Sequence, residues 1–155
     1  MKVAKDKIAV MSYKKVHDNK KLIILDEVKK NFKGGDVYHY DFMGEVKFRT
    51  INKSAKFDIT KAQFNDAEYF GLTTNSDFES AKPSDWYFMT KKMILPYLKN
   101  ATGKKDINGI PKSGKFKEMN LLVFISNAIN GFNTFLPILK KNKKNKKIGT
   151  LEAFI

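Results

Sequence analysis

The stretch that decides the fold is DVYHYDFMGEVKFRTI, residues 36–51. In its first half Val37 and His39 alternate with Tyr38 and Tyr40, and GEVKFRTI continues the same period of two. Alternation of this kind is typical of β-strands whose two faces meet different surroundings. The stretch therefore predicts two neighbouring strands.

The connection between these strands is predicted at Asp41-Phe42-Met43-Gly44, because Asp is favoured at the first position of a turn and Gly at the fourth. This makes the pair an antiparallel hairpin. Upstream, the apolar and β-branched runs 8–16 and 22–28 predict two more strands joined by a short basic loop. Downstream, SAKFDI at 54–59 predicts another short strand.

Helices are predicted in the second half of the chain. Thr60 and Gln63 have the spacing of a capping box, which predicts a helix over 61–70 that ends at Gly71. Ser84 can cap a second helix, which Pro96 ends or kinks. The apolar segment 116–139 predicts a buried helix, although its LLVFI run fits a central strand equally well.

Strands followed by helices predict the α+β class. We expect an N-terminal antiparallel sheet over about residues 7–60, then two or three helices and a basic C-terminal tail. With 155 residues, of which 42% are hydrophobic, the chain has the material for one core. A single globular domain is expected over 1–139, and a lysine-rich tail with an apolar end over 140–155.

Composition excludes several classes of function. The chain has no cysteine, so disulfides, thiol catalysis and thiolate metal sites are excluded. No apolar run approaches the roughly 18 residues of a membrane span, and no secretory signal is readable. We therefore expect no membrane partner, and a location in the cytoplasm or within a nucleoprotein or virion particle.

The net charge of +14 is the main functional signal, with 30 basic against 16 acidic residues. The wealth of Lys, Asn, Ile and Phe is typical of A+T-rich genomes, such as those of many phages, but base composition does not account for the shortage of acids. Positive charges that repel one another destabilise the compact state, and a polyanionic partner would relieve this repulsion. The leading hypothesis is a non-catalytic basic protein, without cofactor or metal, that docks on nucleic acid or an acidic protein surface within a larger assembly.

The residues expected to bind the polyanion form two lysine groups and include the only arginine. Arginine suits bidentate base recognition better than lysine does, so contacts to the phosphate backbone are expected. The apolar end of the tail would anchor it on a partner. The binding residues are Arg49, Lys104, Lys105, Lys112, Lys115, Lys117, Lys140, Lys141, Lys143, Lys144, Lys146 and Lys147, and the anchors are Phe154 and Ile155.

Aromatic residues next to lysines offer a further binding hypothesis. Tyr13, Phe32, Phe48 and Phe57 each adjoin a basic residue. Stacking platforms beside cationic groups are the two ingredients of single-strand binding. The alternative is an ordinary core, with aromatic residues inside and lysines outside.

The hairpin also supports an enzymatic alternative. Asp36 or Asp41 on one strand, followed by Glu45 and Lys47 on the next, resembles the acid plus Glu-x-Lys constellation of metal-dependent nucleases. That chemistry uses two carboxylates to hold a divalent ion and a lysine to activate water or stabilise charge. Residues two apart on a strand lie on the same face, as Glu45 and Lys47 would.

Other chemistry has weaker signals. His39 and Asp41 would pair along one strand as a general base, although a partly exposed structural histidine is the simpler interpretation. GIPKSGK at 109–115 resembles a phosphate-binding loop but lacks the Ser or Thr after its lysine. A third class, a protein-binding inhibitor or scaffold, remains open.

Overall fold

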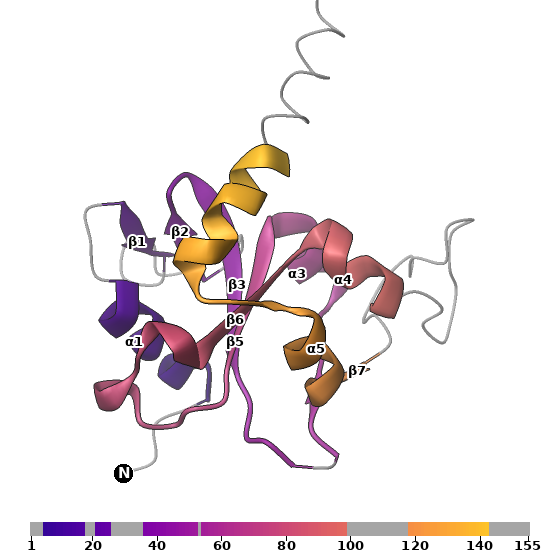
Figure 1. Cartoon of the computed structure of the whole chain (residues 1–155), viewed down its shortest axis with the longest axis horizontal. Coiled ribbons are helices and arrows are strands. Elements are labelled where there is room, and N and C mark those ends of the chain that lie inside the picture. Colours follow the sequence, from indigo (N-terminus) through magenta and orange to yellow (C-terminus); the bar gives the residue numbers. More distant parts are fainter. Residues whose placement is uncertain (1–4, 18–20, 26–35, 53, 99–117, 143–155) are drawn as a thin grey trace, which may run out of the picture.

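The computed structural model describes residues 5–17, 21–25, 36–52, 54–98 and 118–142 (Figure 1). The fold is α+β, as predicted. The strands are β1 (Leu22–Ile24), β2 (Val37–His39), β3 (Phe42–Phe48), β4 (Lys56–Phe57), β5 (Tyr69–Thr73), β6 (Trp86–Thr90), β7 (Met119–Asn120) and β8 (Ile129–Asn130). The α-helices are α1 (Lys5–His17), α3 (Lys61–Asp66), α4 (Lys91–Leu98), α5 (Leu121–Asn127) and a further helix over 132–142.

Six strands form one sheet in the order β1-β2-β3-β5-β6-β8, while β4 and β7 pair separately. The hairpin order β1-β2-β3 is antiparallel, as expected for the N-terminal part. Strand β5 then lies parallel to β3, because the chain crosses over through β4 and α3 before it enters the sheet. The sheet is therefore mixed.

The first segment is a helix, so the prediction of a strand over 8–16 was wrong. Ala9, Ser12 and Tyr13 are fully buried, and their spacing of three and four is that of a helix face. The strand prediction relied on the number of apolar and β-branched residues in this segment and did not consider the spacing between them.

The hairpin between β2 and β3 is confirmed. Its turn was predicted at Asp41–Gly44, but it lies two residues earlier in the chain. His39 pairs with Phe42, which leaves Tyr40 and Asp41 as a two-residue turn with φ angles of 52° and 68°. Two left-handed residues define the tight turn that suits twisted strands. Gly44 lies inside β3 instead, where a Cβ would come within 2.3 Å of the Tyr69 ring.

The capping box of α3 is confirmed. The Gln63 backbone N–H donates to Thr60 Oγ1 at 3.1 Å, and the Thr60 N–H donates to Gln63 Oε1 at 3.0 Å. The helix ends at Asp66, before the predicted residue 70, because β5 begins at Tyr69.

The later helices differ from the predictions in a similar way. The segment after Ser84 first forms β6 and becomes helical only at α4, which carries Pro96 inside it. The LLVFI run is helical in α5, one of the two alternatives. The single helix expected over 116–139 is divided by β8 and by Gly131, whose φ is +84°.

The sheet separates two apolar cores. On one face, Val46 and Phe48 pack with Tyr13 of α1 and with Phe132 and Phe135 of the 132–142 helix. On the other face the core is built by β4, α4, α5 and β7; its members include Phe57, Phe70, Leu72, Ile94, Met119 and Phe124. Figure 1 shows α1 to the left of the strands and α4 and α5 to the right. Within the described part of the chain, no helix has the length and hydrophobicity to cross a membrane.

Candidate functional site

Two charged residues of β3 and one that precedes β2 converge on one face of the sheet. Asp36 is fixed by the hairpin at both its backbone and its side chain, since its N–H donates to the Gly44 carbonyl at 3.0 Å and its Oδ2 accepts from the Val46 N–H at 2.8 Å. Its carboxyl group therefore lies beside Glu45, which is next to Val46 in the chain. The hairpin register brings these two acids together.

Glu45 and Lys47 point to the face that carries α3 and β4. They pair with Phe70 and Leu72 across the parallel strands, and those two residues belong to the core on that face. The Lys47 Nζ lies 6.0 Å from the centre of the Phe57 ring of β4. Glu45 and Lys47 are only 8% and 9% exposed, so both ionisable groups are held largely out of water.

A cavity of about 610 Å³ opens beside these residues. Its charged and polar lining comes from the start of β2, from β3 and from α3. The lining residues are Asp36, Glu45, Val46, Lys47, Phe48, Arg49 and Gln63.

The pKa of Glu45 is raised far above that of an ordinary carboxyl group. Burial, a hydrogen bond to Asp36 and the charge of Asp36 raise the pKa of Glu45 from its ordinary 4.5 to about 9, whereas Lys47 and Arg49 oppose this rise. Burial also lowers the pKa of Lys47, which the charge of Glu45 partly counteracts. Two adjacent carboxyl groups with one raised pKa are a common feature of sites that bind cations or transfer protons.

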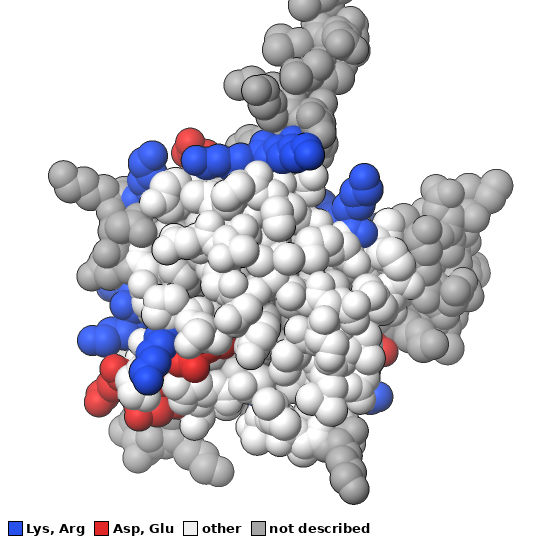
Figure 2. All heavy atoms as spheres, in the orientation of Figure 1, with Lys and Arg blue, Asp and Glu red and all other residues white. Residues whose placement is uncertain are grey.

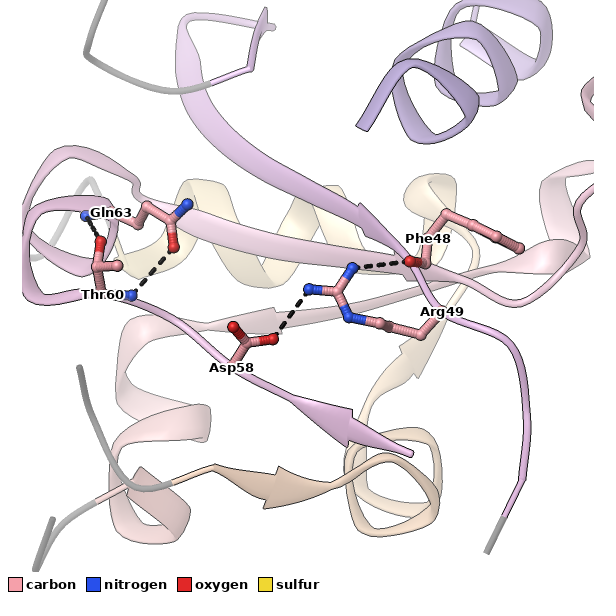
Figure 3. Close-up of polar contacts among 5 residues, drawn as sticks. All are labelled: Phe48, Arg49, Asp58, Thr60 and Gln63. Carbon is pink, nitrogen blue, oxygen red and sulfur yellow. Dashed lines mark hydrogen bonds and ion pairs between the residues drawn. The ribbon is translucent and has the colours of Figure 1, made fainter. Parts of the chain in front are cut away.

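Arg49 also lines the cavity, and Figure 3 shows its contacts with Asp58 and Phe48. One guanidinium nitrogen donates to Asp58 Oδ1 at 2.9 Å and the other to the Phe48 carbonyl at 2.8 Å. These contacts fix the plane of the guanidinium group, and the Arg49 side chain is 23% exposed. A planar, oriented guanidinium is well suited to bind phosphate oxygens.

Gln63 reaches the cavity from α3, the helix that its own capping box begins. Figure 3 shows its Oε1 turned to Thr60, which leaves the amide NH₂ as its remaining polar group. An amide NH₂ is a hydrogen-bond donor. The sequence identified Gln63 only as a capping residue and Arg49 only as a polyanion contact, because neither shows a spacing that links it to Glu45.

The structure decides between the two acids that the sequence offered. Asp36 lines the cavity, whereas Asp41 lies in the hairpin turn. In the described part of the chain no three His, Asp or Glu side chains gather to bind a metal. Asp36 and Glu45 nevertheless suit a hard cation such as Mg²⁺, which takes oxygen ligands and keeps several waters.

The lysine groups expected to bind a polyanion fall mostly outside the described residues. The exceptions are Lys140 and Lys141, both exposed on the 132–142 helix. On the face drawn in Figure 2, basic side chains lie around the margin and uncharged residues occupy the centre. The residues outside the described ranges are Lys104, Lys105, Lys112, Lys115, Lys117, Lys143, Lys144, Lys146, Lys147, the anchors Phe154 and Ile155, and the glycine loop at 109–115.

The stacking hypothesis is wrong for the three aromatic residues that can be checked. Tyr13 and Phe57 are fully buried and Phe48 is 5% exposed, so they belong to the core. Phe32 lies outside the described residues. The expected partial exposure of His39 is also wrong, because its ring is 1% exposed and its Nδ1 lies 2.8 Å from the Tyr13 hydroxyl.

Comparison with known proteins returned no matching family model, curated protein or solved structure. The chemistry of the Asp36–Glu45–Lys47 cavity is therefore the basis for assigning a function. That cavity combines two carboxyl groups, an amine, a guanidinium and an amide.

Proposed function

We propose that this protein is a metal-dependent nuclease, whose reaction is hydrolysis of a phosphodiester bond in the cavity beside β3. The observation that carries the proposal is the convergence of Asp36, Glu45 and Lys47 in that one cavity. This is the acid plus Glu-x-Lys constellation of metal-dependent nucleases, here built on a hairpin whose register fixes all three residues.

Asp36 and Glu45 would hold the divalent cation. Asp36 Oδ2 accepts the Val46 N–H at 2.8 Å, which orients the carboxylate that would help to hold a cation. A cation bound beside Glu45 would favour its ionised form and so oppose the burial and the Asp36 charge that raise its pKa. When bound, such a cation lowers the pKa of a coordinated water and offsets the charge of the phosphate.

The other residues act on the substrate. Lys47, whose pKa is lowered by burial, exchanges a proton more readily near neutral pH than an exposed lysine does. Arg49 binds a non-bridging phosphate oxygen in an orientation set by Asp58. Gln63 also lines the cavity, and its amide NH₂ would donate a hydrogen bond to the substrate.

Nucleic acid is the substrate class that best fits the charge. A chain with a net charge of +14 attracts polyanions whichever phosphate it cleaves. The same charge supports a second candidate, the non-catalytic polyanion-binding role within a larger assembly. The two candidates differ in two respects, because the non-catalytic role needs no divalent cation and leaves the nucleic acid intact.

The test uses the full chain with labelled single- and double-stranded DNA and RNA, in Mg²⁺, Mn²⁺, Ca²⁺ or chelator. We expect cleavage in Mg²⁺ or Mn²⁺ that is lost in Asp36→Asn, Glu45→Gln and Lys47→Met. Asp41→Asn is the matched control, because it removes the other hairpin acid and Asn tolerates the left-handed backbone. Salt-sensitive binding without cleavage in any cation would instead assign the polyanion-binding role.

A further inference from the structure

Of the described residues that line the cavity beside β3, Gln63 alone has a side chain that is polar but uncharged. It comes from α3, whereas the charged residues belong to the β2–β3 hairpin or lie just outside it. An amide can present either an acceptor or a donor to a ligand. Which of the two faces the cavity decides the kind of group that Gln63 can bind there.

The capping box of α3 fixes the orientation of the Gln63 amide. The Thr60 N–H donates to Gln63 Oε1 at 3.0 Å, and the Gln63 backbone N–H donates to Thr60 Oγ1 at 3.1 Å. A flip of the amide would set its NH₂ against the Thr60 N–H, so that two donors would face each other. The carbonyl oxygen is therefore held at the start of the helix, and Figure 3 shows the amide nitrogen turned away from Thr60.

The cavity consequently meets Gln63 as a hydrogen-bond donor. The ammonium of Lys47 and the guanidinium of Arg49 are donors as well. Arg49 is also fixed in orientation, by contacts of 2.9 Å to Asp58 and 2.8 Å to the Phe48 carbonyl. Three donors, two of them oriented by the fold, favour a ligand that offers acceptors, as the non-bridging oxygens of a phosphate do.

The capping role alone does not require glutamine at this position. Gln63 is the third residue of the helix, where glutamate completes a capping box equally well because its carboxylate accepts the same backbone N–H. In the cavity the two residues differ. Glutamate would replace the donor by an acceptor and would add a third carboxylate to those of Asp36 and Glu45. The identity of residue 63 therefore matters to the cavity more than to the helix.

We propose that Gln63 sets the charge selectivity of this cavity: its amide is a fixed donor to a phosphate oxygen, and its neutrality limits the cation site to two carboxylates. Two carboxylates balance the charge of one divalent cation, whereas three would exceed it and repel the phosphate. The inference rests on the proposed nuclease function for the identity of its ligands, but it concerns their binding and needs no cleavage.

The test compares Gln63→Glu with Asn65→Asp in the full chain. Asn65 is exposed on the same helix and does not line the cavity, so its variant adds the same charge outside the site. Affinity for a short labelled single strand of DNA is measured in chelator, so that no divalent cation takes part. We expect Gln63→Glu to weaken strand binding about five- to tenfold, and Asn65→Asp to weaken it less than about twofold because its charge is screened by salt.

A second measurement, calorimetric titration with Ca²⁺ in the absence of nucleic acid, should change in the opposite direction. We expect Gln63→Glu to bind Ca²⁺ roughly five- to tenfold more tightly than wild type, because oxygen ligands of higher total charge increase the affinity for this cation. Asn65→Asp should bind it as wild type does. A residue that only caps the helix would alter neither affinity.

Urea denaturation separates these effects from stability. Gln63→Glu should keep the wild-type midpoint because the capping box is retained, whereas Gln63→Ala, which loses it, should have a lower midpoint. Unchanged strand affinity, unchanged Ca²⁺ affinity, or a lower midpoint for Gln63→Glu than for Asn65→Asp would overturn the proposal. Both expected shifts without cleavage in any cation would reject the nuclease and keep this assignment, and cleavage without the shifts would do the reverse.

Discussion

Substitution of Glu45 by Gln tests the electrostatics of the candidate nuclease site without any substrate. Glutamine keeps the shape and the hydrogen-bonding capacity of a protonated glutamic acid, but it cannot lose a proton. If Glu45 is neutral in the metal-free protein near pH 7, the substitution should be tolerated. If Glu45 is instead ionised and paired with Lys47, the substitution should leave a buried ammonium group without its partner.

The sign of the pH dependence follows from the raised pKa. Between pH 4.5 and about 9 the folded protein keeps a proton that the unfolded chain releases, so the free energy of unfolding must fall as pH rises through this range. At 1.36 kcal/mol per pH unit the ceiling is roughly 6 kcal/mol. Water in the adjoining cavity reduces it, and we expect about 1–3 kcal/mol.

Other groups titrate outside the range of interest or in the opposite direction. Burial lowers the pKa of His17 to about 4 and that of His39 to about 3, so both destabilise the fold only as pH falls below their ordinary 6.5. The pKa values of Tyr13 and Tyr69 are raised by burial, which matters only above pH 10. The lowered pKa of Lys47 increases stability with pH and so opposes Glu45.

The assay is urea denaturation of the wild type, Glu45→Gln and Asp41→Asn from pH 6.5 to 9, in chelator. We expect wild type and Asp41→Asn to lose stability with rising pH and Glu45→Gln to lose less, so that Glu45→Gln is the most stable of the three at pH 9. Millimolar Ca²⁺ should stabilise wild type and Asp41→Asn but not Glu45→Gln. Flat wild-type stability, together with a Glu45→Gln variant that is less stable at pH 9, would refute the neutral-Glu45 interpretation in favour of an ion pair.

Three further predictions concern the surroundings of the site. Gly44→Ala should destabilise the fold by about 1–3 kcal/mol in thermal or urea unfolding, because the new methyl would meet the Tyr69 ring; a change as small as that of an exposed substitution would show that β3 shifts freely. Tyr13→Phe should cost about 1–3 kcal/mol, because the Tyr13 hydroxyl lies 2.8 Å from His39 Nδ1 and 2.7 Å from the Tyr69 hydroxyl; an unchanged unfolding midpoint would contradict this. Arg49→Gln should raise KM more than it lowers kcat and change stability by less than about 1 kcal/mol, as expected for a partly exposed ion pair; an unchanged KM in cleavage kinetics would remove Arg49 from substrate binding.

Local patterns predicted those elements whose signals are local. The β2–β3 hairpin and the Thr60–Gln63 capping box both depend on residues within a few positions of one another, and both are confirmed. The α1 helix was missed because its buried residues follow a helical period within a run rich in strand-forming residues. The β6 strand was missed because helical spacing in SDWYFMTKKMIL also fits a strand that leads into a helix.

The candidate site was only half predictable for a related reason. Glu45 and Lys47 are two residues apart on one strand, so their shared face follows from the chain itself. The choice of Asp36 over Asp41 depends on the turn, and the turn depends on Gly44 lying under Tyr69, 25 positions away in the sequence. Arg49 and Gln63 lie in the connection from β3 to β5, and its path brings both residues to the cavity. No pattern in the sequence predicted that path.

The β2–β3 hairpin also determines which side chains reach the Asp36–Glu45–Lys47 cavity and which reach the core on the other face. Successive residues of a strand point to opposite faces, so β2 directs Val37 and His39 toward α1, while Asp36, just before it, lies with Glu45 in the cavity on the other face. A slip of β2 by one residue against β3 would turn His39 out of the core and move Asp36 away from Glu45. The left-handed Tyr40–Asp41 turn fixes that register and also brings the Tyr40 ring within cation–π distance of Lys21 and Lys140. The conformation of Tyr40 is therefore coupled to the candidate site, because a turn of different length would separate Asp36 from Glu45 on one face and remove His39 from its contact with Tyr13 on the other.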